Sequence, residues 1–309
     1  MTHFKHPPLI TILGPTASGK TKLAVALAKQ YKGEIISADS RQVYRGMDIG
    51  TGKDLIEYGE TPYHLIDIIN PDKEYNLYQF SKDFSLCYTE IIKKSALPFL
   101  VGGTGMYLDA VLSRYNLTIA KTSENARKLY EKKSKAELIS HLYKLKPELH
   151  NTTDINDQNR LIQAITIAEA ENAKEETISW PDFNPFILGI NINKELCQAK
   201  ITQRLKIRLK EGMIDEVIKL KSTQGNVDWE TLENFGLEYR FIAQHLQGKL
   251  NYNDMFQKLN SAIHHFAKQQ NKWFRKLEKK GHQIHWLESN EQLLDNAMKL
   301  LNTFNSQYK

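Results

Sequence analysis

Two spacings of apolar residues alternate along the first 115 residues and predict alternating strands and helices. Unbroken apolar runs are typical of strands buried on both faces of a parallel sheet, whereas apolar residues every three to four positions are typical of helices. The predicted strands are 9–13, 34–37 and 98–101, and the predicted helices are 20–29, 77–94 and one that begins near residue 106. A third apolar run, 63–69, ends at Asn70 and Pro71. This alternation predicts a parallel sheet with helices on both faces.

After residue 115 the pattern becomes helical and rich in lysine and glutamate. One all-apolar run, 186–192, then returns as a predicted core strand. The other predicted elements are helices at 123–133, 135–145, 160–174, 194–212, 213–222, 239–246 and 253–279, and a short strand at 283–287. The chain is therefore predicted to have a sheet core formed by 1–115 and 186–309, with a helical insertion domain at 116–185 and a mostly helical C-terminal part.

A glycine-rich segment connects the first predicted strand to the first predicted helix. It fits the pattern G-x-x-x-x-G-K-[ST] with Gly14, Pro15, Thr16, Ala17, Ser18, Gly19, Lys20 and Thr21. In a strand–loop–helix context the backbone N–H groups turn inward around a phosphate, and the helix N-terminus adds partial positive charge. Lys20 can reach the terminal phosphate, and the Thr21 hydroxyl can ligate Mg²⁺. All four fixed positions are present, so the segment predicts a phosphate site rather than a chance glycine turn.

Two other polar segments follow predicted strands, at 39–42 (D-S-R-Q) and 102–105 (G-G-T-G). Ligands of open α/β sheets bind beyond the carboxyl ends of the strands, so both segments are expected beside the phosphate loop. Asp39 at such a position suits a magnesium ligand, a general base or a cap of the next helix. The glycines of 102–105 suit backbone donors beside Thr104, and they equally suit a tight strand-to-helix turn.

Composition narrows the class of protein. The chain has 309 residues, 41% of them hydrophobic, and no apolar run of the ~20 residues that a membrane span needs. The N-terminus has no apolar signal region, and the only two cysteines, Cys87 and Cys197, lack metal or redox spacing. These features predict a cytoplasmic protein with free thiols. No apolar surface pattern demands a partner chain, so a monomer is expected.

The net charge of +6 is concentrated in two basic stretches. The first contains Lys200, Arg204, Lys206, Arg208 and Lys210, and the second contains Lys268, Lys272, Arg275, Lys276, Lys279 and Lys280 among Phe266, Trp273 and Phe274. Basic and aromatic residues mixed in this way suit a polyanion with stackable bases. A solvated lysine-rich helix face explains the same pattern, and composition alone leaves both interpretations open.

Taken in order, the motifs of the chain strongly resemble those of the tRNA dimethylallyltransferase (isopentenyltransferase) family. The most specific are G-P-T-A-S-G-K-T at 14–21, I-S-A-D-S-R-Q-V-Y-R-G-M-D-I-G-T at 36–51, Y-H-L-I-D-I at 63–68 and V-G-G-T-G-M-Y at 101–107. Further similar segments are 155–163, 208–217, 235–239 and 267–273. The resemblance extends from residue 9 to about residue 286 and is weakest between 116 and 151.

The resemblance implies a P-loop NTPase-like α/β fold and a specific reaction. A dimethylallyl group moves from dimethylallyl diphosphate to the exocyclic amine of adenosine at tRNA position 37, next to the anticodon, and diphosphate leaves. Asp39 matches the base of the family, and Thr104 matches a threonine near the donor phosphate and the tRNA. Lys20, with the rest of the phosphate loop and Mg²⁺, is implied to stabilise the leaving diphosphate.

The resemblance also implies residues that bind tRNA. Segment 39–42 supplies Ser40, Arg41 and Gln42, which can bond the edges of an adenine that has left its stack. The helical insertion is implied to grip the anticodon stem-loop. Its expected contacts are Arg127, Asn159, Arg160, Leu161, Ile162 and Gln163.

The chain departs from the usual family pattern at several positions. Lys200 stands where many members have an arginine that helps to hold the diphosphate, and lysine lacks the two-pronged geometry of arginine. Asn159 and Gln163 replace Gln and Arg. Near the C-terminus, Ile263, His264, His265 and Gln269 replace a pattern richer in threonine and arginine. These departures affect the expected affinity for tRNA and the choice of tRNA more than the chemistry.

Two other functions share parts of this pattern. A small-molecule kinase would have the same phosphate loop and parallel sheet, but it would need a lid with arginines over ATP. A tRNA-binding protein without catalysis would need none of Lys20, Thr21, Asp39 and Thr104. An assay with dimethylallyl diphosphate, Mg²⁺ and tRNA distinguishes both from a prenyltransferase, because only the prenyltransferase forms modified adenosine.

Overall fold

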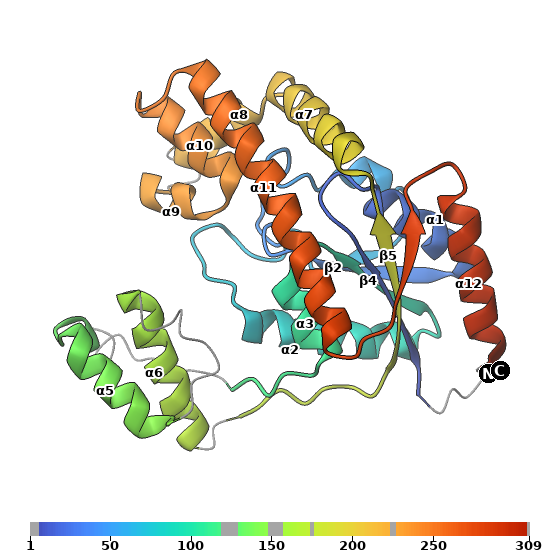
Figure 1. Ribbon diagram of the computed structural model, residues 1–309, viewed down its shortest axis with the longest axis horizontal. Coiled ribbons are helices and arrows are strands. Elements are labelled where there is room, and N and C mark those ends of the chain that lie inside the picture. Colours follow the sequence, from blue (N-terminus) through green and yellow to red (C-terminus); the bar gives the residue numbers. More distant parts are fainter. Residues whose placement is uncertain (1–5, 119–128, 148–156, 174–175, 223–226, 308–309) are drawn as a thin grey trace. The chain divides into compact units, whose positions relative to one another are not determined.

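A six-stranded parallel sheet forms the centre of the molecule's larger unit (Figure 1). The computed structural model describes residues 6–118, 129–147, 157–173, 176–222 and 227–307. The strands lie in the order β3 (Tyr63–His64), β2 (Gly33–Ala38), β4 (Leu97–Gly102), β1 (Pro8–Leu13), β5 (Asn184–Asn191) and β6 (Ile284–Glu288). Every residue of β1 and β2 is buried, as their unbroken apolar runs predicted. All strand pairs are parallel.

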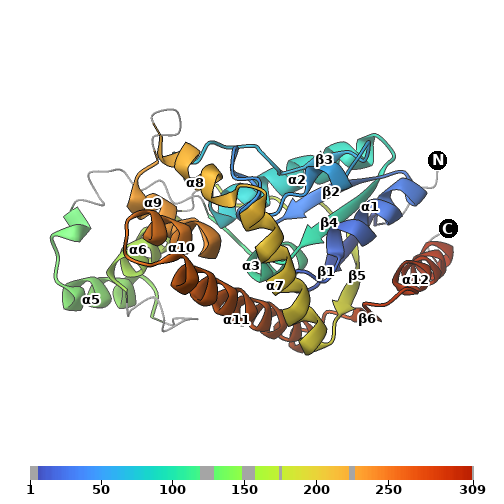
Figure 2. The ribbon, with the colours of Figure 1, turned by 90° about the horizontal axis from the view of Figure 1, so that it is seen from above.

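Helices cover both faces of this sheet (Figures 1 and 2). On one face α1 (Lys20–Tyr31) and α12 (Leu293–Gln307) pack against apolar side chains of β1, β2, β4 and β5. On the other face α2 (Leu77–Lys93) and α3 (Gly105–Leu112) form a second core with alternate residues of the same strands. Because strand side chains alternate between faces, the runs must be apolar throughout to bury both sides.

A helical group follows β5. It consists of α7 (Lys194–Lys210), α8 (Met213–Lys221), α9 (Trp229–Asn234), α10 (Leu237–Leu246) and the first half of α11 (Tyr252–Lys279). Its core includes Met255 and Leu259 of α11, together with Val43 and Met47 from the segment after β2. The last turns of α11 instead pack on the sheet (Figure 1). One long helix therefore connects the group with the sheet.

The insertion is a separate compact unit, Tyr115–Ser179. Its described helices are α5 (Lys135–Leu145) and α6 (Gln158–Asn172), which pack through a core of their own. The predicted boundary at residue 185 differs from this structure, because residues 180–185 belong to the larger unit, where Trp180 and Phe183 pack with its core. Residues 123–128 of the predicted helix 123–133 lie outside the described residues.

The third apolar run, 63–69, forms less regular structure than the other apolar runs. Only Tyr63–His64 forms a strand, at the edge of the sheet. Leu65 and Asp67 then adopt left-handed backbone conformations with φ of 62° and 57°, which end the strand. Leu65 and Ile66 belong to the cores on opposite faces of the sheet.

Both cysteines of the chain lie in the described part of the structure. Cys87 and Cys197 are free thiols. Among the helices in the described part of the chain, none combines the length and the apolar character required to cross a bilayer.

Candidate functional site

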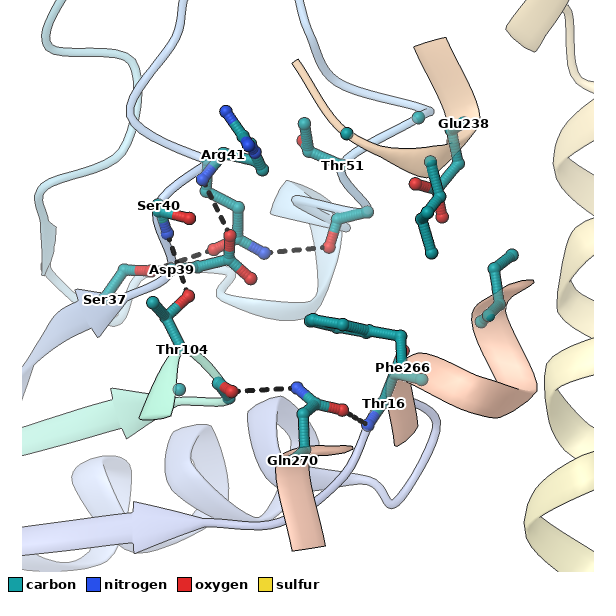
Figure 3. A pocket seen from close by; sticks show the side chains of 18 of the residues that line it. Thr16, Ser37, Asp39, Ser40, Arg41, Thr51, Thr104, Glu238, Phe266 and Gln270 are labelled. Atoms are coloured by element: carbon teal, nitrogen blue, oxygen red, sulfur yellow. Dashed lines mark hydrogen bonds between the residues drawn. The ribbon is translucent and has the colours of Figure 1, made fainter. Parts of the chain in front are cut away.

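The strand order brings three polar loops to one edge of the sheet. β4 lies between β1 and β2, and Gly102 is in register with Leu13 on one side and Ala38 on the other. The loops that follow these residues therefore begin side by side. They open on a cavity of about 490 Å³ within the larger unit, and Lys20 is on its wall. Asp39 and Thr104 border the same cavity (Figure 3). The polar segments predicted to share a pocket do so.

Three side chains of the phosphate loop line this cavity, those of Thr16, Lys20 and Thr21. The other loop residues, Gly14, Pro15, Ala17, Ser18 and Gly19, are not among the cavity-lining residues of the described structure. The Lys20 ammonium donates to the Pro15 carbonyl over 2.9 Å. Burial, with a smaller effect from the Arg204 charge, lowers the pKa of Lys20 to about 8. Lys20 is therefore a cation at neutral pH, in a place where an anion would bind.

Asp39 lies across the cavity from the helical group, directly after β2 (Figure 3). Its Oδ1 accepts a hydrogen bond from the Arg41 N–H over 2.9 Å, and the carboxylate borders the cavity. Asp39 thus caps the local turn and faces the site at the same time. The Ser40 N–H donates to the Thr104 Oγ1 over 3.1 Å, which ties the loop after β2 to the loop after β4.

Gln42 is part of a second set of contacts in the same wall. Its Oε1 accepts from the Ser37 hydroxyl over 2.9 Å, and its Nε2 donates to the Gly52 carbonyl over 3.1 Å. Ser40 and Arg41 also border the cavity. All four predicted residues of 39–42 therefore lie at the site, although their contacts with RNA stay a prediction.

The arginine beside the phosphate loop is Arg204, which the sequence interpretation did not select. Its guanidinium donates to the Thr16 hydroxyl, and Arg204 and Arg208 both border the cavity. Burial lowers the pKa of Arg204 to about 10, so it is charged at neutral pH. Lys200, one turn earlier on α7, is not among the cavity-lining residues. The sequence did contain a signal for this position. Arg204 and Arg208 are four residues apart, and they lie on α7 next to the buried Leu205 and one or two turns after the buried Ile201.

Arg208 lies deeper in the same wall and is buried. Its Nη2 contacts the Asp54 carboxylate over 3.2 Å. Gly52 has a φ of 62°, which disfavours other residues, and a Cβ there would lie 1.8 Å from the Arg208 Nη2, so the guanidinium would have to move. Glu238 of α10 faces the same space, and burial raises its pKa (Figure 3).

Gln270 joins the two loops that flank the cavity. This buried residue of α11 accepts from the Thr16 N–H over 2.8 Å and donates to the Gly103 carbonyl over 2.9 Å (Figure 3). A Cβ at position 103 would lie 2.2 Å from the Gln270 Nε2, so a side chain there would displace the Gln270 amide. No local pattern marks Gln270, because both of its partners are more than 160 residues away in the chain.

Glu216 fixes another part of the cavity wall. Its buried carboxylate accepts from the backbone N–H groups of Asp48 and Ile49 over 2.7 Å each and of Gly50 over 3.0 Å. It also accepts from the Tyr239 hydroxyl over 2.7 Å. The loop that it holds contributes residues 50–52 to the wall.

Replacing Glu216 by glutamine is expected to lower both stability and catalytic turnover. The amide would point N–H groups at other donors and leave buried N–H groups unpaired, at a cost of about 1–3 kcal/mol. Glu233→Gln is the matched control, because Glu233 accepts from Gln244, Gln247 and Lys249 away from the cavity. Urea unfolding should show a loss in both variants, whereas turnover well below the unfolding transition should fall only for Glu216→Gln. Equal turnover in the two variants would contradict the role of Glu216.

The predicted RNA-binding residues of the insertion divide into two groups. Asn159, Arg160 and Gln163 are exposed on α6. Leu161 and Ile162 are 0% and 4% exposed and belong to the core of the insertion, and the expected RNA contact of this segment stays a prediction. The helical period places them on the inner face. Arg127 lies outside the described residues.

The side chains of the second basic stretch also differ in their exposure and contacts. Lys268, Lys272, Arg275, Lys276 and Lys279 are exposed. Lys280 instead pairs with the buried Asp109 over 2.6 Å, and Phe274 is fully buried. Phe266 and Trp273 border the cavity, as do Ile263 and Gln269. His264 contacts Thr202 and Gln198 of α7, so this departure from the family pattern lies between helices.

A glycine-rich strand-to-helix loop on a parallel sheet, with a carboxylate on the same cavity, is typical of the P-loop class of α/β folds. Comparison with known families is more specific. The chain belongs to the IPP transferase family, which matches residues 42–277, and the Isopentenyl transferase family matches residues 7–59.

Individual relatives agree with this assignment. The chain is 52% identical over 293 residues to tRNA dimethylallyltransferase 1 of Geotalea uraniireducens, covering 95% of this chain and 96% of that one. It is 53% identical to tRNA dimethylallyltransferase 2 of Syntrophotalea carbinolica, covering 91% and 94%. The crystal structure of the tRNA isopentenylpyrophosphate transferase of Bacillus halodurans is similar, with a TM-score of 0.70, 31% identity and coverage of 97% and 96%. A eukaryotic dimethylallyltransferase that acts on tRNA shares the fold, with a TM-score of 0.82 at 22% identity, covering 98% and 80%.

Proposed function

We propose that this protein transfers a dimethylallyl group from dimethylallyl diphosphate to the exocyclic amine of adenosine 37 of tRNA. The products are N6-(dimethylallyl)adenosine and diphosphate. The observation that carries the proposal is the single cavity on which the phosphate loop, Arg204 and Asp39 converge. A diphosphate leaving group and an amine acceptor need this combination of cations and a carboxylate.

The donor side of the reaction fits the cationic end of the cavity. The bond between the allylic carbon and the diphosphate oxygen breaks, so negative charge grows on the diphosphate. Lys20 and Arg204 stabilise that charge, and Gln270 holds the loop that carries Thr16 in place. Arg204 takes the role that the sequence interpretation gave to Lys200.

Mg²⁺ fits the same end. The Thr21 hydroxyl borders the cavity at the start of α1, and Mg²⁺ usually combines one or two protein oxygens with substrate phosphates and water. No group of three or more His, Cys, Asp or Glu side chains suited to a metal occurs among the described residues. When bound, the ion would neutralise part of the diphosphate charge.

Asp39 is suited to the acceptor side. The amine of adenine is a poor nucleophile because its lone pair is delocalised into the ring. As its nitrogen bonds to the allylic carbon, one N–H proton must leave, and the Asp39 carboxylate accepts it. The hydrogen bond from the Arg41 N–H orients the carboxylate for this step.

The tRNA is proposed to reach this cavity through its anticodon stem-loop. The exposed residues Asn159, Arg160 and Gln163 of the insertion and the exposed lysines of α11 would contact its backbone. Segment 39–42 would hold the target adenosine. We propose that the protein acts on tRNA as a monomer in the cytoplasm.

One assay tests the proposal. The purified protein is mixed with dimethylallyl diphosphate, Mg²⁺ and unmodified tRNA, and the nucleosides are analysed by mass spectrometry. Prenylated adenosine is expected. ATP consumption without prenylation would indicate a kinase, and tRNA binding with neither activity would indicate a binding protein without catalysis.

A further inference from the structure

Phe266 of α11 is an unusual residue in the wall of the cavity. It is 44% exposed, although a buried phenylalanine side chain stabilises a fold by about 1.5–3 kcal/mol. Among the residues that the structure describes, no other aromatic ring contacts it. Its ring extends from α11 into the space that Asp39, Thr104 and Glu238 also border (Figure 3). An apolar, flat surface is therefore presented to the site.

The surroundings of Phe266 suit RNA rather than the small donor. The cations for the diphosphate, Lys20 and Arg204, lie at the phosphate loop, and burial lowers the pKa of both groups. Phe266 and the 48% exposed Met106 instead form a solvent-accessible part of the same wall. Further along α11, Lys272 and Lys276 are exposed, and Lys276 covers the Trp273 ring at 4.6 Å. Aromatic faces beside cations are how proteins bind splayed-out bases.

We propose that Phe266 is the platform on which the target adenine stacks when it enters the cavity. This inference rests on the proposed function and extends it to a named contact. A base that leaves the RNA stack loses its stacking partners, and an aromatic ring in the pocket replaces them. Stacking on one face fixes the plane of the purine, so its exocyclic amine can point at Asp39. Phe266 thereby positions the nucleophile without taking part in proton transfer.

The kinetic test compares Phe266→Leu with Phe266→Trp. Leucine is apolar and of similar bulk but has no flat π-face, so kcat/KM for tRNA should fall roughly 5- to 150-fold, with an unchanged KM for dimethylallyl diphosphate. Tryptophan should retain activity within a few-fold. Tyr252→Leu is the matched control, since Tyr252 is 48% exposed on the same helix but is not among the cavity-lining residues. The control should behave as the unaltered protein.

A second measurement follows the base itself. An anticodon stem-loop with 2-aminopurine at the target position lacks the reactive amine, and its fluorescence is quenched by stacking. On binding, the fluorescence should rise more with Phe266→Leu than with the unaltered protein, and least with Phe266→Trp.

The outcomes separate this inference from the proposed function. Unchanged turnover and fluorescence in Phe266→Leu, with normal prenylation by the unaltered protein, would overturn the platform alone. A raised KM for the donor with unchanged fluorescence would assign the ring to the dimethylallyl group and would also overturn it. Absence of prenylation by the unaltered protein would overturn both.

Discussion

Replacing Asp39 by alanine is expected to lower the rate of prenyl transfer by at least about 100-fold, the low end of what a general base contributes. The adenine amine would then have no carboxylate to accept its proton as the carbon–nitrogen bond forms. Binding of tRNA should change little, because the phosphate contacts that dominate RNA affinity lie elsewhere. Single-turnover rates with saturating donor, together with binding of an anticodon stem-loop, measure the two effects separately.

Asp39→Asn refines this test. Asparagine can still accept the hydrogen bond from the Arg41 N–H, so the local turn is kept while the base is lost. It should therefore be about as slow as alanine. Asp54→Asn is the control, because Asp54 is another carboxylate of the cavity wall, paired with Arg208. A near-normal rate for Asp39→Asn would remove Asp39 from the role of base.

Replacing Lys20 by methionine is expected to lower kcat/KM for the donor by about 100-fold or more, comparable to the loss of one oxyanion donor. The ammonium is directed at the phosphate loop, and methionine keeps its length but not its charge. Binding of tRNA should be unaffected. Initial rates at varied dimethylallyl diphosphate concentrations measure the effect.

Lys22→Met is the control for this test. Lys22 lies two positions later on the exposed side of α1, and its replacement should leave kcat/KM for the donor nearly unchanged. Similar losses in both variants would contradict the assignment.

The lowered pKa of Lys20 also predicts how kcat/KM for the donor depends on pH. Its pKa is lowered from the ordinary value to about 8, so the free protein loses this positive charge as the pH rises through 8. kcat/KM for the donor, which reports on the free protein, should then fall with rising pH, and kcat should fall less because bound diphosphate favours the ammonium. The steep decline should be absent in Lys20→Met. A decline of the same size in that variant would assign it to another group.

Much of the fold follows from local patterns. β1, β2, β4 and β5 lie within two residues of the predicted strands, because a strand buried on both faces has to be apolar at every position. The long helices were equally clear from their spacing. α9, with only six residues, and α12 were not predicted. In the run 63–69 the strand stops after His64, because Leu65 and Asp67 adopt left-handed backbone conformations that an apolar pattern does not reveal.

The candidate site was predictable only in part. The phosphate loop, Asp39 and Thr104 were selected correctly as neighbours, because each follows a strand and the ends of parallel strands meet at one edge. The sequence pattern did not reveal that Arg204, rather than Lys200, borders the cavity, since both are cations on one helix and only their direction distinguishes them. The family motif that contains Leu161 and Ile162 likewise did not reveal that both lie in the core of the insertion.

The sequence by itself determined the phosphate loop, the carboxylate after the second strand and the family, because each depends on residues that are adjacent or nearly so in the chain. Only the tertiary structure decided that Gln270 joins the two loops, that Glu216 holds the wall and that the Phe266 ring faces the cavity. These residues are set by contacts with partners distant in sequence. Their positions follow from how α8 and α11 pack against the sheet loops, and no local spacing of residues encodes that packing.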